Sequence, residues 1–327
     1  MTFSAPTLPH PYLINGLNHI PPPPISSFDN LFSFSGLLPP GESIPSSWGT
    51  TRYYDFAPAS PPSSRRVLLI HGGGTCAIGL APLARLLTEA GNHVVTYDTW
   101  GHGLSSTPLE THTPALFHAQ ILELLAYLGW TKVHLVGFSI GGSTVVTFAA
   151  LHDRVVESVI AVAPAGLWRK SNRSWWDVIG MDGFNLPGLE WWRRNTVINY
   201  VHGSNPVVKE GWKERMVKGE VDTVPIEKWE REEHRGHVAS LVSTWNYGGV
   251  FDQHESYGKL LEKKFKTLVV LGSKDGVIEP EDTKKELEKL GWKGEVPVVE
   301  GATHDIVRSH RKEVAVLCIE FWEKLEK

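Results

Sequence analysis

Short runs of consecutive apolar residues alternate along this chain with longer segments in which apolar residues recur every three or four positions. The short runs predict strands buried on both faces, at residues 67–70, 94–97, 133–137, 159–162, 267–271 and 297–300. Connecting helices cover both faces of such a parallel sheet. The pattern predicts an α/β fold with a mostly parallel central sheet and helices on both faces, preceded by an edge strand at 51–56.

The longer segments predict amphipathic helices at residues 80–90, 114–128, 281–290 and 313–325. The second of them begins at Thr113-Pro114, where a favourable N-cap residue is followed by proline at the first helical position. Phe117 and Ile121 then share one face, and Gly129 ends the helix. Strands and helices therefore alternate through most of the chain.

The alternation breaks after residue 167. Up to residue 247 no apolar strand occurs, and charged residues are interleaved with aromatic ones. Because the alternation resumes afterwards, we expect a helical insertion at 167–247 in a core formed by 49–166 and 248–327. The sequence contains no internal repeat.

Tryptophan is concentrated in this insertion, which holds eight of the 13 tryptophans of the chain. Two adjacent rings cannot both lie on the buried face of one helix. Some of these rings should therefore line a pocket or face a partner, and Trp168, Trp191 and Trp245 are our candidates for substrate binding. The alternative is that the tryptophans form the core of the insertion.

Residues 1–48 form a proline-rich N-terminal arm, with prolines at 21–24 and 39–40. Prolines at this density disfavour a helix or an interior strand. The apolar residues between them, such as Phe28 and Phe32, are too numerous for a free linker. We expect an extended arm packed over the body, with a binding peptide as the alternative.

Composition narrows the function classes. A formal net charge of −4 without a long basic run gives no electrostatic footprint for nucleic acid. Cys76 and Cys318 suggest neither a disulfide framework nor a metal knuckle. No apolar run reaches the roughly 20 residues that span a bilayer, and residues 1–15 lack the pattern of a secretion signal. We therefore expect a cytoplasmic protein without a transmembrane segment.

A candidate nucleophile follows the run at 133–136. The pentapeptide at 137–141 has the pattern Gly-Phe-Ser-Ile-Gly and leads into a segment of small and apolar residues that predicts a helix. Glycines at both ends allow a sharp turn from strand to helix, which exposes the Ser139 hydroxyl at the carboxyl edge of the sheet. The backbone N–H of Ile140 lies beside it at the helix N-terminus, where developing negative charge is stabilised.

A serine hydroxyl needs a base, and the base is best held by a carboxylate. Catalytic groups of a parallel sheet lie just past the carboxyl ends of its strands. Asp275 and His304 follow the runs at 267–271 and 297–300, so we predict a triad of Ser139, Asp275 and His304. Competing bases are His71, His102, His254 and His310, and competing acids are Asp98, Asp252, Glu279 and Asp305. We expect Asp98 to brace a loop.

Three glycines follow His71 directly after the run at 67–70. Residues without side chains let backbone N–H groups approach a substrate oxygen. We predict an oxyanion hole formed by the N–H groups of Gly73 and Ile140, with Gly72 as the alternative donor.

With these motifs the sequence resembles the α/β-hydrolase superfamily over roughly residues 50–326. Residues 71–74 match the oxyanion loop of that family, 137–141 its nucleophile elbow, and 97–105 its turn after the next strand. The resemblance implies an α/β-hydrolase fold in which the helical insertion is a cap or lid. It is similar to the lipase, esterase and carbon–carbon hydrolase branches. The aspartate nucleophile of epoxide hydrolases and haloalkane dehalogenases is replaced here by Ser139.

We therefore expect a serine hydrolase, without a cofactor or metal, that cleaves a carboxylic ester or lactone of a moderately large apolar or aromatic substrate. The same triad serves a carbon–carbon bond hydrolase of a diketone, and a ligand receptor built on the hydrolase scaffold is a further alternative. A third alternative is that the tryptophans of the insertion bind a lipid interface. No partner other than a small-molecule substrate is predicted, and the sequence does not determine the oligomeric state.

Overall fold

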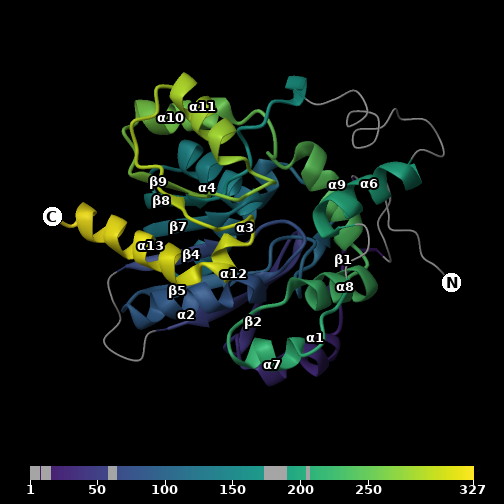
Figure 1. The fold of residues 1–327 in the computed structure, drawn as a ribbon. Helices are drawn as coiled ribbons and strands as arrows, with labels where there is room; N and C mark the ends of the chain where they lie inside the picture. Colours follow the sequence, from purple (N-terminus) through teal and green to yellow (C-terminus); the bar gives the residue numbers. More distant parts are fainter. Residues whose placement is uncertain (1–7, 9–15, 58–64, 173–189, 204–206) are drawn as a thin grey trace.

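The computed structural model describes residue 8 and residues 16–57, 65–172, 190–203 and 207–327. Helices lie on both sides of a central sheet, and a smaller group of helices lies beyond one end of it (Figure 1). Within the described residues, eight strands form this sheet in the order β10-β9-β8-β7-β4-β5-β3-β2. Their bounds are β2 Gly41–Ser46, β3 Gly49–Phe56, β4 Arg66–Ile70, β5 His93–Tyr97, β7 Val133–Phe138, β8 Val156–Val162, β9 Thr267–Gly272 and β10 Val298–Val299.

The six strands from β4 to β10 are parallel, and they coincide with the six apolar runs of the sequence. The mostly parallel sheet is thereby confirmed. The segment at 51–56 does form a strand, β3, which pairs antiparallel with β5. The expectation that it is the edge strand is wrong, because β2 pairs along its other side. Pro45 in β2 has no N–H to donate, and an edge strand tolerates this loss.

Helices cover both faces of the sheet (Figure 1). Along β4, Val67 and Leu69 pack into the apolar layer beneath α2 and α13, whereas Leu68 and Ile70 pack into the layer beneath α3, α4 and α10. This alternation follows from the two-residue period of a strand. The helices of these layers are α2 Ala81–Glu89, α3 Pro114–Tyr127, α4 Ile140–Leu151, α10 His254–Glu262, α11 Pro280–Lys289, α12 Ile306–Ser309 and α13 Arg311–Leu325, with the 3₁₀ segment η2 Ala77–Leu80 before α2.

The described part of the insertion is helical, as the sequence predicts. It contains α6 Glu190–His202, α7 Trp212–Val217, α8 Thr223–Glu233 and α9 His237–Tyr247, after the short 3₁₀ segment η3 Lys170–Asn172. Helix α9 is fixed to the core because the Ser240 hydroxyl donates to the carbonyl of Trp100. A Cβ atom on Gly101 would lie 2.1 Å from Ser240 Cβ, so the two segments approach closely only because residue 101 is glycine.

The N-terminal arm is more regular than predicted. Helix α1 (Ile25–Phe32) starts immediately after the four prolines, followed by the 3₁₀ segment η1 (Ser33–Ser35). A short ribbon pairs β1 (His19–Ile20) with β6 (Thr107–Pro108). The expectation of an extended arm is wrong here because prolines that precede a helix remove no intrahelical hydrogen bond.

The arm packs on the insertion. Phe28 and Phe32 contact Trp229 of α8 with ring centroids 5.1 and 6.1 Å apart. Residues 41–46, which we assigned to the arm, belong to the central sheet as β2. The N-terminal arm therefore contacts both the insertion and the core.

Candidate active site

Ser139 lies at the sharp turn between β7 and α4. Its backbone has φ 55° and ψ −117°, a conformation that a non-glycine residue adopts only under strain. The turn is held because the N–H of Ser139 donates to the carbonyl of Val162 in the neighbouring strand. A backbone kept in this state presents the hydroxyl beyond the strand end.

The flanking glycines are required by close packing of the backbone. A Cβ atom on Gly137 would lie 2.1 Å from the carbonyl oxygen of Gly141. On Gly141 it would lie 2.3 Å from the carbonyl oxygen of Ile70 in β4. Neither position accepts a side chain, which gives the pentapeptide pattern its physical basis.

His304 and Asp275 meet Ser139 at the carboxyl edge of the sheet. Nδ1 of His304 lies 2.9 Å from Oδ2 of Asp275, and Nε2 lies 3.1 Å from Oγ of Ser139. A carboxylate oxygen accepts, so the imidazole proton lies on Nδ1 and the Nε2 lone pair faces the serine hydroxyl. The three side chains form one chain of hydrogen bonds, in which Ser139 and His304 are 165 positions apart in the sequence.

Asp275 is itself held in place. Its side chain is buried, and Oδ1 accepts hydrogen bonds from the N–H groups of Val277 and Ile278, both at 2.8 Å. The second oxygen is thereby directed at His304. The carboxylate can orient the imidazole because its own rotation is blocked on the other side.

The other histidines have different partners. His71 accepts from the N–H of Thr99 at Nε2, and Nδ1 lies 2.7 Å from the carbonyl of Gly72. Burial lowers the pKa of His71 to about 4. His254 pairs with Glu286, and His310 contacts Ser309.

Two of the competing carboxylates have other partners. Asp98 is buried and accepts from the N–H groups of Ala77 and Leu104, so it braces two loops, as expected. Burial raises the pKa of Asp98 to about 6. Asp305 pairs with Arg308.

The glycine loop after β4 lies against the nucleophile turn. A Cβ atom on Gly72 would lie 3.0 Å from Ser139 Cβ, and one on Gly73 would lie 2.8 Å from Ile140 Cδ1. The loop approaches Ser139 this closely because both residues lack side chains. Its backbone is therefore near enough to act on a group bound at the serine.

A cavity of about 20 Å³ adjoins this loop, room for about one water molecule. Leu241 and Thr244 of α9 form its wall on the side of the insertion. The complete lining consists of Ile70, His71, Gly72, Gly73, Thr99, His102, Phe117, Ile140, Gly141, Thr144, Leu241 and Thr244.

The candidate tryptophans do not line this cavity. Trp168 and Trp245 pack together with ring centroids 6.3 Å apart, and both contact Phe251. The side chain of Trp191 is 72% exposed. As substrate-binding residues, these three tryptophans stay predictions. Trp175 and Trp176 lie outside the described residues.

Sequence reasoning missed a buried polar group between the insertion and the core. Glu230 Oε1 accepts from the N–H of Gly103, and His237 Nδ1 lies 2.9 Å from the carbonyl of Gly101. Burial raises the pKa of Glu230 and lowers that of His237. No spacing in the sequence indicates these contacts, because acidic and histidine residues of a helical insertion ordinarily face water.

In the part of the chain that the structure describes, no group of three or more His, Cys, Asp or Glu side chains is arranged to hold a metal ion. Among the same residues, no helix combines the length and apolarity needed to cross a membrane.

Comparison with known proteins agrees with the fold. The sequence model of a family described as having the alpha/beta hydrolase fold matches residues 65–202. Lipase 1 of Psychrobacter immobilis is 26% identical over 73% of this chain and 70% of its own. A 2-hydroxy-6-oxo-6-(2'-aminophenyl)hexa-2,4-dienoic acid hydrolase of Metapseudomonas resinovorans is 25% identical over 73% of this chain and 76% of its own. For a proline iminopeptidase of Clostridium botulinum, 28% identical over 37% of this chain, the alignment spans only 43% of the relative's length.

Solved structures extend the likeness to nearly the whole chain. The crystal structure of a bacterial membrane phospholipase A superimposes with a TM-score of 0.64 at 20% identity. The superposition covers 93% of this chain and 91% of the phospholipase. At this identity the likeness establishes the shared fold.

Proposed function

We propose that this chain, which has the α/β-hydrolase fold, is a serine hydrolase acting on a carboxylic ester or lactone. The observation that carries the proposal is the hydrogen-bond chain from Ser139 through His304 to Asp275. Ser139 has a strained backbone, the Nε2 lone pair of His304 faces its hydroxyl, and the fixed carboxylate of Asp275 holds that imidazole. This arrangement is suited to nucleophilic attack.

In the first half of the reaction, Nε2 of His304 takes the proton of Ser139 as Oγ attacks the carbonyl carbon. The carbonyl oxygen becomes an oxyanion, which the N–H groups of Gly73 and Ile140 stabilise, with Gly72 as the alternative donor. Removing one such donor typically costs about 3 to 4 kcal/mol of transition-state stabilisation. Asp275 stabilises the imidazolium that forms.

The intermediate then collapses. The imidazolium gives its proton to the leaving alkoxide, the alcohol departs, and an ester of Ser139 remains. In the second half, His304 deprotonates a water molecule that attacks this ester, and the proton returns to Ser139 as the carboxylic acid leaves. A lactone follows the same steps, except that alcohol and acid leave as one hydroxy acid.

The substrate we propose is apolar or aromatic and of moderate size. Apolar side chains of the core and the insertion surround the oxyanion loop, and pockets of this kind bind apolar ligands with few polar contacts. A cavity of about 20 Å³ holds no such substrate, and we propose that the Leu241 side chain moves when substrate binds. The helical insertion at 167–247 therefore acts as a cap whose packing limits access.

A second candidate is cleavage of a carbon–carbon bond in a diketone. The relative from Metapseudomonas resinovorans, a hydrolase of a dienoic acid by its name, aligns over as much of the chain as the lipase does. The same serine, histidine and carboxylate serve both reactions, so the distinction depends on the substrate.

The test is hydrolysis of p-nitrophenyl esters of increasing acyl length by the wild type and by Ser139→Ala. We expect ester turnover that is lost in Ser139→Ala while the thermal unfolding transition is unchanged. Ester turnover that survives in Ser139→Ala contradicts the proposed mechanism. Turnover of a vinylogous diketone but of no ester favours the carbon–carbon hydrolase instead.

A further inference from the structure

Four buried imidazole rings form a continuous row from the oxyanion loop to the helical insertion. In order they belong to His71, His102, His237 and His202, with successive ring centroids 5.1, 4.9 and 5.5 Å apart. The first two come from loops of the core, whereas His237 begins α9 and His202 ends α6. The row therefore joins the core to the insertion, and it contains no residue of the triad.

The first ring holds one end of the oxyanion loop. Nε2 of His71 accepts from the N–H of Thr99, so Nδ1 is the donor to the carbonyl of Gly72 at 2.7 Å. In a planar trans peptide, the carbonyl oxygen and the N–H that follows it point in opposite directions. The bond to the Gly72 carbonyl therefore fixes the direction of the Gly73 N–H, the oxyanion donor of the proposed reaction.

The last ring packs on the other end of the loop. Gly74 has φ 79°, in the left-handed region. A Cβ atom there would lie 2.7 Å from Val201 Cγ1 and 3.1 Å from His202 Cε1, so the end of α6 contacts the backbone of Gly74 directly. Gly72 contacts the nucleophile turn in the same way. The loop is therefore packed between the nucleophile turn and the insertion.

His202 is itself fixed by polar partners. Its side chain is buried, and Nδ1 lies 3.3 Å from Oε2 of Glu227 in α8. On the other side, Nε2 lies 3.4 Å from Nε2 of His237. His237 donates from Nδ1 to the carbonyl of Gly101, and burial lowers its pKa, so its Nε2 accepts and His202 is the donor. The imidazole of His202 is thereby held against Gly74.

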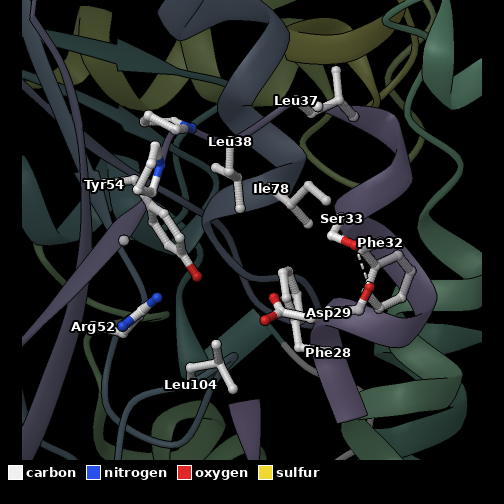
Figure 2. Close-up of a pocket in the computed structure, with 14 residues that line it drawn as sticks. Phe28, Asp29, Phe32, Ser33, Leu37, Leu38, Arg52, Tyr54, Ile78 and Leu104 are labelled. Carbon is white, nitrogen blue, oxygen red and sulfur yellow. Dashed lines mark hydrogen bonds between the residues drawn. The ribbon is translucent and has the colours of Figure 1, made fainter. Parts of the chain in front are cut away.

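The core end of the row is anchored to the sheet. His102 lies in the loop after β5, which begins with Asp98. The carboxylate of Asp98 accepts from the N–H of Leu104 at 2.9 Å and from the Tyr54 hydroxyl of β3 at 3.4 Å. The side chains of Tyr54 and Leu104 in turn line a cavity of about 380 Å³ beneath the N-terminal arm (Figure 2). Because this end is anchored, the insertion end determines how firmly the oxyanion loop is held.

We propose that His202 is a positioning residue, which holds the oxyanion loop in its active geometry through Gly74. This role rests on the proposed function, in which N–H groups of the loop stabilise the oxyanion. Stability alone does not require a buried polar pair at this place, since well-packed apolar residues often stabilise a fold as well or better. Misplacing a group at the reacting centre by about 1 Å can lower turnover by about a hundredfold.

The first test measures the loop without any turnover. Backbone hydrogen exchange of the full-length protein is followed by mass spectrometry in the peptide that covers residues 71–78. We expect exchange to be about tenfold faster in His202→Ala than in the wild type, because the loop opens more often without its clamp. Asn199→Ala changes an exposed residue of the same helix and should leave this exchange unchanged. Exchange in β9 should be unaffected in both variants.

The second test measures binding of an oxyanion. A trifluoromethyl ketone with an octyl chain adds to Ser139 Oγ, the serine proton passes to His304, and the ketone oxygen becomes an oxyanion at the loop. In His202→Ala we expect the inhibition constant to rise and kcat to fall, each by about tenfold or more, with KM within about threefold of the wild type. His202→Gln keeps an N–H donor near the position of Nε2 and should recover most of both. A role in stability alone would lower the unfolding temperature and leave both constants of the folded enzyme unchanged.

Unchanged exchange of residues 71–78 in folded His202→Ala overturns the proposal, and so does faster exchange without a rise in the inhibition constant. If His202→Ala does not fold, exchange of the wild type in increasing urea gives the answer. Residues 71–78 and 197–202 should then open together with one free energy of opening, and a loop that stays protected while 197–202 opens overturns the proposal. A wild type that turns over no ester contradicts the proposed function instead. The exchange measurement needs no substrate and shows separately whether His202 holds the loop.

Discussion

Replacing Asp275 by asparagine should disable the histidine without disturbing the fold, and the reason lies in the two N–H groups that hold the carboxylate. Oδ1 of Asp275 accepts from Val277 and Ile278, both at 2.8 Å. In Asp275→Asn the amide oxygen must take this position, because an NH₂ group there would face two donors. The NH₂ group is then directed at Nδ1 of His304, which can bond to it only as an acceptor.

The proton of the neutral imidazole therefore moves to Nε2. This nitrogen lies 3.1 Å from Ser139 Oγ and would donate to the hydroxyl instead of accepting its proton. Loss of the correct tautomer lowers kcat by about 10⁴ in a serine protease with the same arrangement. This factor corresponds to about 5.5 kcal/mol in the activation free energy. We expect a decrease of this order in ester turnover.

The assay is kcat for the best p-nitrophenyl ester, with thermal unfolding as the check on folding. Asp305→Asn is the matched control, since it removes the neighbouring carboxylate, which pairs with Arg308 and not with His304. We expect Asp305→Asn to retain most of the activity. If Asp275→Asn keeps kcat within tenfold of the wild type, the tautomer argument and the role of Asp275 are both refuted.

Three further predictions address the turn, the cap and acid stability. Gly137→Ala places Cβ 2.1 Å from the backbone oxygen of Gly141 and should lower the free energy of unfolding, measured in urea, by about 3 kcal/mol or more. Gly258→Ala is the control, because residue 258 faces open space on α10, and it should be neutral or stabilising. Leu241→Ala should enlarge the small cavity and raise kcat/KM for long relative to short acyl esters by about tenfold; an unchanged chain-length profile would show that α9 does not limit access. Burial lowers the pKa of His234 to about 4, so between pH 6.5 and pH 4 the unfolded chain binds more protons than the folded protein. The unfolding free energy therefore decreases as the pH is lowered through this window. Between pH 7 and pH 5, the decrease in unfolding free energy should be about 2 kcal/mol smaller in His234→Gln than in the wild type. Equal pH slopes for both proteins would contradict the burial argument.

The sequence by itself determined the central sheet and the order of the candidate catalytic groups. Runs such as 67–70 and 133–137 are apolar without interruption because parallel strands are buried on both faces, and this pattern is local. Ser139, Asp275 and His304 could be found because each follows such a run, and the carboxyl ends of parallel strands share one edge. The glycines around Ser139 are equally readable, since their packing is dictated by the turn itself.

Only the tertiary structure decided what covers that edge and what lies under the arm. Residues 41–46 join the sheet through pairing with β3, although Pro45 argues against a strand. Trp191 is exposed, and Leu241 lines the small cavity. These positions depend on how α6 and α9 pack and not on residue type. The close packing of Arg52 against Gly41 depends on the register that places Gly41 opposite Tyr54. Contacts between distant segments depend on the packing of the whole chain, and no local period encodes them.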